Sequence, residues 1–357
     1  MSKNYKIIKN IIIGFSIILL ILLIIFTIDI INDEPEWAWF DIDFDNSKVS
    51  NYGTLIGGLL SFLAILFVIF GLAEQREQVN DEKHEKTREI IDEYASRLKL
   101  MNSFLHNILA EIKLQGERME KFFKIEKEQP TQSNVTHFSA NKSFNRILEM
   151  DSLINYKSIQ HYFKNEDGWE KMFLNLYNFV DFYSASIEEH RIKYQNHIAD
   201  KVERQKEVSE LCRDFLKIGS RLMEKYRKEF GNELYLNKKW AIAYNDFVPA
   251  YYHYVNECVE KQEQTNFRFL SDNFFLKFIT IAMEIRAEEG FDDFGSEDLV
   301  DIASSIRKKI FEIDMYSIQY AENVEYYFNE YFNFECDFYK DFDKIRVKIE
   351  QKVALIK

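Results

Sequence analysis

The segment VSNYGTLIGGLLSFLAILFVIFGLA, residues 49–73, contains no charged side chain and is long enough to cross about 30 Å of hydrocarbon as a helix. No Gly or Pro follows it between Ala73 and Leu114. We therefore expect the helix of this apolar run to continue without a break through residues 74–128, as a polar stalk and then a long packed helix. Apolar residues return at helical spacing from Ile90 onward, which indicates packing against a folded domain.

A second apolar run, IIIGFSIILLILLIIFTI, occupies residues 11–28 and predicts a transmembrane helix over residues 11–31. A cleaved signal peptide is the alternative interpretation of this run. The run is longer than the apolar part of most signal peptides, however, and no cleavage site with small residues follows it. The chain is therefore expected to begin with a two-helix transmembrane hairpin, whose helices span residues 11–31 and 49–73.

The charges around this hairpin predict its orientation. Residues 1–10 carry three lysines, whereas the connecting loop, residues 32–48, carries six carboxylates and a single lysine. Positively charged flanks stay on the cytoplasmic side of a membrane. We therefore expect a multi-pass protein of the inner (plasma) membrane with the lipid bilayer as a partner. Both termini are expected in the cytoplasm, and the short acidic loop outside it.

Small residues form a stripe along the second apolar helix. Gly53, Gly57 and Ser61 recur every four residues, and Ala64 lies one step further round the helix. Such stripes allow two membrane helices to approach closely. Two interpretations are open, because the stripe can seat the first helix of the same hairpin or join protomers in a homo-oligomer.

The remainder of the chain is expected to be all-α. The chain has only 11 Gly and 3 Pro, so few positions interrupt a helix, and its 32 Phe and 20 Tyr supply apolar surface for a core. Residues 129–143 lack periodicity and predict a loop. Residues 144–357 predict a cytoplasmic bundle of long helices. We expect these helices to be interrupted near residues 165–168, 231–232, 249 and 290–295.

The last helix is expected to begin near residue 297 or 312 and to end near residue 355. Ser296, followed by Glu297 and Asp298, is typical of a helix start with an acidic first turn. Apolar residues then recur every three or four positions, which is typical of a coiled-coil seam or a helix packed on a core. This seam comprises Val324, Tyr327, Tyr331, Phe334, Phe338, Phe342, Ile345, Ile349 and Val353.

Net charge and cysteine spacing narrow the classes of partner. The formal net charge of −13 argues against a protein that wraps a nucleic-acid backbone. Residues 191–239 are locally basic, with 13 Lys or Arg against 8 Asp or Glu. An anionic partner can dock on such a segment, although mixed charges on an exposed helix give the same count. The three cysteines form no pair with metal-ligand spacing, so neither a metal nor a cofactor is expected.

Catalytic signatures are weak in this sequence. It contains no phosphate-binding loop, serine-hydrolase elbow, zinc-protease motif or dinucleotide fingerprint. Arg191 and His197 have a spacing that resembles the HEPN family of helical ribonucleases, where such a pair activates the ribose hydroxyl. The polar residue usual after that Arg is Ile192 here. A solvated helix face is the alternative interpretation of the two residues.

The stretch from the second apolar helix into the charged stalk resembles the phage abortive infection family of the AbiC type. Members are similar at a glycine-rich second span that runs directly into Gln-Arg and a charged helix. The matching residues here are Gly53, Gly57, Gly58, Gln75 and Arg76. Residues 266–279 correspond only approximately to a second family segment. The resemblance implies a defence protein that acts after phage entry, and it implies no known active site.

These observations lead to one leading hypothesis and two alternatives. The leading hypothesis is a membrane-anchored antiphage effector, more a non-enzyme than an enzyme. Its helical domain would sense an infection cue, including a phage or host trigger protein, and would impair the host membrane or phage production. The first alternative is a membrane-tethered HEPN-like ribonuclease with Arg191 and His197 as catalytic residues. The second is a non-enzymatic helical scaffold that anchors a partner at the membrane.

Overall fold

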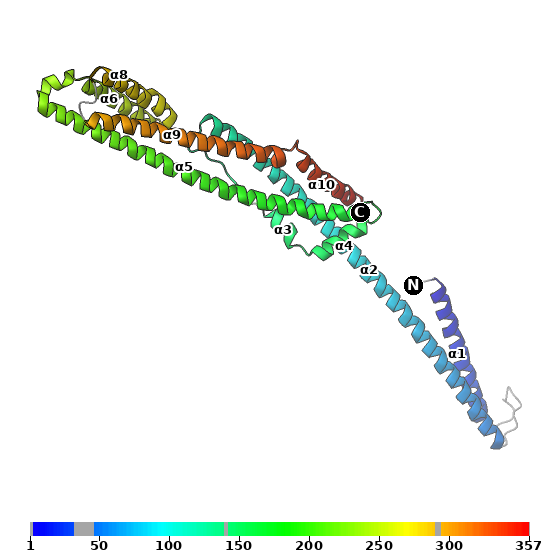
Figure 1. The fold of residues 1–357 in the computed structure, drawn as a ribbon. Helices are drawn as coiled ribbons and strands as arrows, with labels where there is room; N and C mark the ends of the chain where they lie inside the picture. Colours follow the sequence, from blue (N-terminus) through cyan, green and yellow to red (C-terminus); the bar gives the residue numbers. More distant parts are fainter. Residues whose placement is uncertain (1–2, 32–45, 139–141, 290–293, 357) are drawn as a thin grey trace. The chain divides into compact units, whose positions relative to one another are not determined.

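A computed structural model of the chain describes residues 3–31, 46–138, 142–289 and 294–356. These residues are helical almost throughout and include no strand, so the all-α prediction is confirmed (Figure 1). The chain divides into two compact units, Met1–Glu93 and Tyr94–Lys357, which we describe separately. Most of the predicted loop at residues 32–48 lies outside the described residues.

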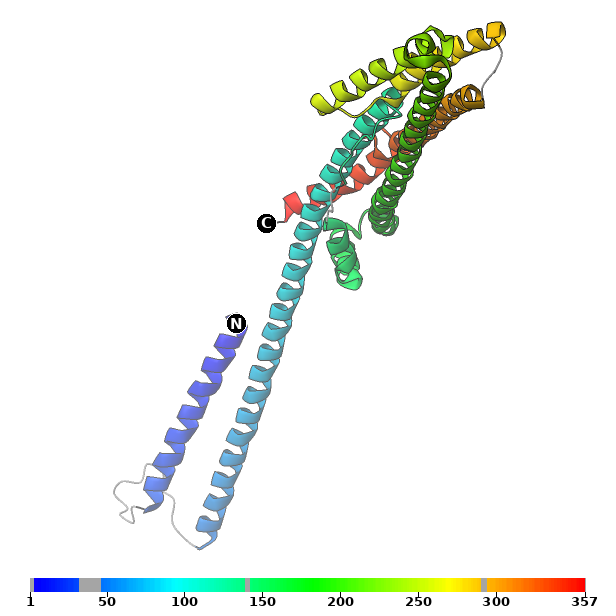
Figure 2. The same ribbon diagram turned by 90° about the vertical axis from the view of Figure 1, so that its left-hand side faces the viewer.

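The first unit contains α1, Lys3–Ile31, and the first half of α2, Asn46–Glu128. The two helices run side by side (Figure 2). The ring of Phe15 meets the ring of Phe62 edge-to-face at 6.2 Å. Leu19 and Leu63 are buried.

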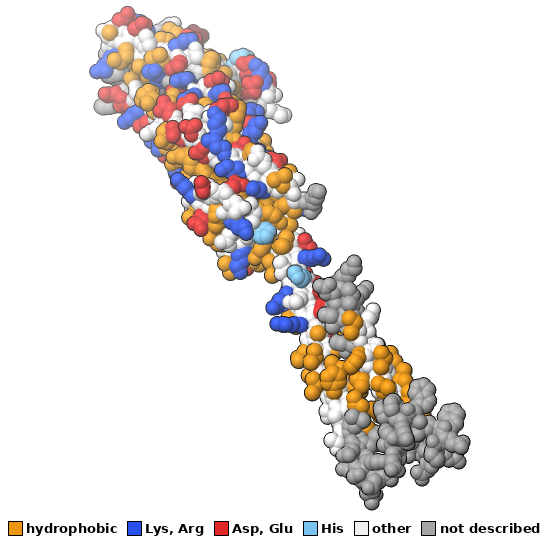
Figure 3. Space-filling model, turned by 90° about the vertical axis from the view of Figure 1, so that its right-hand side faces the viewer, with side chains coloured by type: hydrophobic (Ala, Val, Ile, Leu, Met, Phe, Trp, Pro, Cys, Tyr) orange, Lys and Arg blue, Asp and Glu red, His pale blue; other side chains and the backbone are white. Residues whose placement is uncertain are grey.

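Most other described apolar side chains of this unit are exposed. Phe67 is 61% and Val68 is 62% exposed. Figure 3 shows apolar side chains gathered on this part of the surface. Among the described residues one helix, from Ile56 onward, is long and apolar enough to cross a membrane. The described apolar stretch of α1, Ile13–Ile25, is shorter.

The second unit begins with the later half of α2 and continues through α3, Ser143–Glu149, and α4, Ser152–Phe163. Two long helices follow its length, α5 at Trp169–Leu234 and α9 at Phe294–Tyr327. They run antiparallel, since Tyr183 contacts Phe332 just beyond the end of α9, whereas Lys309 in α9 pairs with Glu207 further along α5. The remaining elements are the short η1, α6, α7, the π-helical η2, α8, the π-helical η3 and α10. In that order, their bounds are η1 Tyr235–Asn237, α6 Lys239–Glu260, α7 Phe267–Leu270, η2 Ser271–Phe275, α8 Leu276–Glu289, η3 Phe328–Phe332 and α10 Asp337–Leu355.

The second unit has two hydrophobic cores along α5 and α9. The first core joins α2, α4, the start of α5, the end of α9 and α10, and includes Ile112, Tyr183 and Phe342. The second core joins the later part of α5 to α6, α8 and the start of α9, and includes Phe215 and Phe247. On α5 the fully buried side chains between the two cores are polar, not apolar. The junction of the cores is therefore chemically distinct from both.

Several helix boundaries differ from those predicted. Pro249 lies inside α6 and does not end it. Because Pro249 has no backbone N–H, the carbonyl of Asn245 lacks its usual helical hydrogen bond. Both residues are exposed, so water can hydrogen-bond to that carbonyl. The predicted last helix is interrupted after Phe332 and resumes at Asp337. Ser296 lies within the first turn of α9, which begins at Phe294.

Two glycines allow close approach between elements of the second unit. A Cβ on Gly219 in α5 would lie 1.9 Å from the ring of Tyr244 in α6. A Cβ on Gly116 in α2 would lie 2.4 Å from the carbonyl oxygen of Phe332. Both separations are shorter than van der Waals contact, so any side chain at these positions would push helices apart.

Candidate functional site

A buried cluster of ionisable side chains occupies the junction between the two cores. Glu126, in the last turn of α2, and Lys201, on α5, are both 0% exposed, and His197 is 1% exposed. Lys201 Nζ donates to Glu126 Oε1 at 2.6 Å, and His197 Nε2 lies 2.9 Å from the same oxygen. His197 and Lys201 are four residues apart and therefore share one face of α5. A single carboxylate thus joins α2 to two successive turns of α5.

Electrostatics explain how this carboxylate stays charged inside the protein. Burial alone would raise the pKa of Glu126, but the hydrogen bond from His197 and the charge of Lys201 outweigh burial and lower the pKa below its ordinary value. Since an ionised carboxylate only accepts hydrogen bonds, His197 must carry its proton on Nε2. Asn134 Nδ2 donates to the second carboxylate oxygen at 2.7 Å. Both oxygens of Glu126 are therefore hydrogen-bonded.

Aromatic rings enclose the imidazole of His197. The ring of Tyr320 stacks on it at a centroid distance of 4.0 Å, and that of Tyr316 lies at 5.2 Å. No described residue hydrogen-bonds to His197 Nδ1, which is buried. Nearby on α9, Asp314 accepts a hydrogen bond from Arg268 at 2.7 Å, while its other oxygen and the hydroxyl of Ser317 are buried without a described partner. The junction is polar and incompletely satisfied by hydrogen bonds.

Residues 129–138, here named the strap, follow α2 as an irregular segment and lie along α5. Gln205 Nε2 donates to the carbonyl of Thr131 at 2.8 Å. The backbone N–H of Thr136 donates to the hydroxyl of Tyr194 at 3.1 Å. Through Asn134 the strap also contacts Glu126. The predicted loop at 129–143 is therefore held to α5 over its first ten residues by specific hydrogen bonds, and α3 begins at Ser143.

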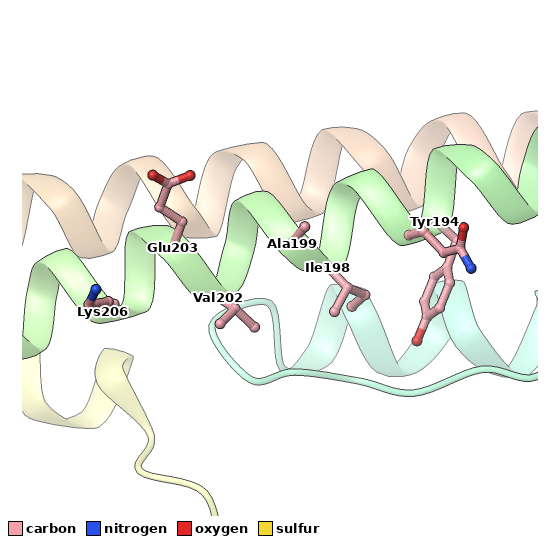
Figure 4. Close-up of a pocket in the computed structure, with 7 residues that line it drawn as sticks. Tyr194, Ile198, Ala199, Val202, Glu203 and Lys206 are labelled. Carbon is pink, nitrogen blue, oxygen red and sulfur yellow. The ribbon is translucent and has the colours of Figure 1, made fainter.

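A shallow apolar groove runs along α5 beside the strap. Figure 4 shows Tyr194, Ile198 and Val202 directed toward the strap side of the helix, whereas Glu203 points to the opposite side. Val202 is 50% exposed. The groove lies on the same helix as the buried cluster.

The structure places the two candidate catalytic residues in different environments. Arg191 is half-exposed, and two of its guanidinium nitrogens bond to Glu188, one turn away on α5. His197 is buried and is bonded to Glu126 instead. A separation of six residues rotates the second side chain by roughly 240° around the helix. Within one chain the two side chains therefore do not converge.

The small-residue stripe is open in the described part of the chain. No described atom lies within 4 Å of a Cβ built on Gly53, Gly57 or Gly58. Ser61 and Ala64 are exposed. The ring contact between α1 and α2 joins Phe15 to Phe62. The remaining residues of the family-like motif, Gln75 and Arg76, are also exposed.

Glu126 and Lys201 were not predicted as site residues from the sequence. The available signal was the pair His197 and Lys201, whose spacing of four residues places both on one helix face. Glu126 is 71 residues from His197 in the sequence, and no local pattern connects them. The described residues bring no three potential metal ligands together. No protein family model, curated protein or solved structure matches the chain.

Proposed function

We propose that this chain is a membrane-anchored antiphage effector of the abortive infection type. Its N-terminal hairpin would lie in the inner membrane with both termini in the cytoplasm. Its helical unit, Tyr94–Lys357, would sense an infection cue, and the response would impair the host membrane or phage production.

One observation about α2 carries the proposal. The same helix exposes apolar side chains such as Phe67 and Val68 in its first half and buries Leu98 and Met101 completely in its second half. Apolar surface that is continuous and exposed to water is rare in soluble proteins. A lipid bilayer would cover this surface, and α2 would then link the membrane directly to the core of the helical unit.

The buried cluster at Glu126 supports a sensing role. Burial of charged groups contributes little net stability compared with apolar packing, but breaking such a pair is costly. A cluster of this kind therefore favours one arrangement of α2 against α5 over others. A cue that altered the strap would act on this arrangement, because Asn134 contacts both the strap backbone and Glu126. This supports a conformational signal more than a catalytic one.

The environment of Arg191 and His197 disfavours the ribonuclease alternative within a single chain. His197 is buried, and both partners already have intramolecular contacts. A dimer that brought Arg191 of one protomer to His197 of another would also have to expose His197. The scaffold alternative shares the membrane anchor but needs no response to infection.

Induced expression in a phage-sensitive host tests the proposal. We expect fewer plaques and loss of infected cells, with intact cellular RNA. Degraded RNA would favour the ribonuclease. Protection that is absent with every phage tested, while the protein is present in the inner membrane, would contradict the proposed function. A cytoplasmic reporter fused after Lys357 should be active, and activity of a periplasmic reporter there would contradict the topology.

A further inference from the structure

A polar cleft of about 610 Å³ lies between the start of the strap and the α6–α7 connection. Its walls come from Gln129 and Gln132 in the strap, from the last turns of α6 and the residues that follow it, and from α7. This volume is in the range of small-molecule sites in proteins. The cleft is separate from the buried cluster but touches the same strap.

Glutamine side chains line the cleft. No described residue hydrogen-bonds to the side chains of Gln129, Gln132 or Gln262, and all three line the cleft. A fourth, Gln264, is engaged, since its Oε1 accepts from the backbone N–H of Ser133 at 2.8 Å. Each carboxamide offers two N–H donors and one acceptor oxygen. The glutamine side chains without a described partner can hydrogen-bond to a ligand that has both donors and acceptors.

Gln262 adopts a backbone conformation that favours glycine. Its φ is 55°, and it is the only non-glycine residue with positive φ in the described part of the chain. It lies two residues beyond the end of α6, where the N–H of Glu263 donates to the carbonyl of Cys258 at 2.9 Å. Glycine is the usual residue at this position of a helix end, and other residues are strained there. A glutamine with a strained backbone at the mouth of a cleft points to a function for its side chain.

Two aromatic side chains, Tyr254 and Phe269, line the cleft. The rings of Tyr254 and Phe269 lie 4.7 Å apart, and Phe269 is 41% exposed. The hydroxyl of Tyr254 accepts from the N–H of Asn266 at 3.1 Å, and Asn266 Oδ1 accepts from the N–H of Phe269. These bonds hold the wall in place before any ligand arrives. The exposed ring of Phe269 can stack on a planar ligand.

The charges of the cleft exclude a phosphate. Lys261, its only cation among the lining residues, donates to Glu257 at 2.6 Å. Glu263 remains as an additional carboxylate, so one Lys faces two Glu and the lining carries a net charge of −1. An anionic group would meet repulsion here and no free cation. The charges therefore disfavour an anionic ligand.

We propose that this cleft binds a neutral purine nucleoside, read by the free carboxamides and placed against Phe269. Carboxamides form paired hydrogen bonds with adenine, and aromatic side chains stack on bases. Gln264 bonds to Ser133 in the strap, which reaches Glu126 through Asn134, so occupancy of the cleft would act on the buried cluster. The role of the nucleoside as an infection cue rests on the proposed sensing function. Nucleoside binding in the cleft does not depend on that function.

Binding of adenosine to the full-length protein in detergent tests the proposal. Isothermal titration should show saturable binding at one site per chain, with adenosine monophosphate at least tenfold weaker. Gln262→Gly should weaken adenosine binding at least fivefold and raise the melting temperature by about 2 °C, because glycine relieves the strain. Phe269→Leu should also weaken binding. Gln319→Ala, which removes an exposed carboxamide outside the cleft, should leave binding unchanged.

Three results would overturn the proposal: no saturable adenosine binding at millimolar concentration, equal or tighter binding of the monophosphate, or unchanged binding by Gln262→Gly. The phage assay separates this proposal from the proposed function. Normal protection by a protein that binds no adenosine would remove the cleft assignment alone. Adenosine binding without protection would remove the defence function and keep the cleft.

Discussion

Glu126 and Lys201 form an ion pair at 2.6 Å with both side chains fully buried, where the two hydrophobic cores of the second unit meet. Removal of one partner leaves an uncompensated charge away from water. We expect Lys201→Met to lower the free energy of unfolding by about 3 to 5 kcal/mol. Chemical denaturation of the full-length protein in detergent, followed by circular dichroism, measures this loss.

The double variant Glu126→Gln with Lys201→Met separates charge from packing. It removes both charges and keeps an acceptor oxygen for His197, so it should be more stable than Lys201→Met alone. Equal stability of the two variants would show that the ion pair does not control the junction.

His190 predicts a dependence of stability on pH. Burial, with a contribution from Lys193, lowers the pKa of His190 from 6.5 to about 4 in the folded protein. The unfolded chain therefore binds a proton near pH 6.5, while the folded chain does so only near pH 4. Stability from this group is present above pH 6.5 and is lost as the pH falls toward 4, by on the order of 3 kcal/mol.

His190→Phe tests this dependence, because phenylalanine keeps a ring against Tyr327 and Phe332 but does not titrate. Denaturation curves at pH 7.5, 6 and 5 should show a smaller loss of stability for the variant than for the natural chain. An identical pH dependence would assign the effect to other groups.

Gly219→Ala should destabilise the second unit by about 1 to 3 kcal/mol, because its methyl group would meet the ring of Tyr244. Ser209→Ala, at an exposed position of the same helix, is the matched control and should change little. Thermal unfolding measures both variants. Equal melting temperatures for the two would mean that α5 and α6 do not approach this closely.

Gly57→Leu should impair association between protomers, since no described residue of the same chain occupies the space beside Gly57. Leucine keeps the helix apolar, so membrane localisation should persist while assembly falls. The size of the detergent-solubilised protein measures assembly. Leu66→Ile is the control and should leave assembly unchanged. A variant that assembles like the natural chain would remove the stripe as a contact between protomers.

The all-α class could be predicted because few Gly and Pro residues interrupt any helix in the chain. The end of α9 could not be predicted from the sequence. No Gly or Pro lies between Tyr327 and Asp337, and the interruption depends on local side-chain bonds. Asn333 Oδ1 accepts from the N–H of Glu335 at 2.9 Å, and Cys336 Sγ accepts from the N–H of Tyr339. These residues end and restart helices only in a suitable tertiary context.

The candidate site was partly visible in the sequence. His197 attracted attention through its spacing from Arg191, but its partner in the fold, Glu126, comes from α2. Spacing along one helix reports which residues share a face, and it carries no information about which distant helix packs there. The cleft was invisible for the same reason, because the strained backbone of Gln262 appears only once α6 ends.

Membrane potential in infected cells tests the central claim most directly. A voltage-sensitive dye should report depolarisation in cells that express the full-length protein and are infected, before phage release. Uninfected expressing cells, and infected cells that express Lys201→Met, should keep their potential. An unchanged membrane potential in infected cells that express the protein, together with normal phage production in those cells, would contradict an effector that acts from the membrane on either target.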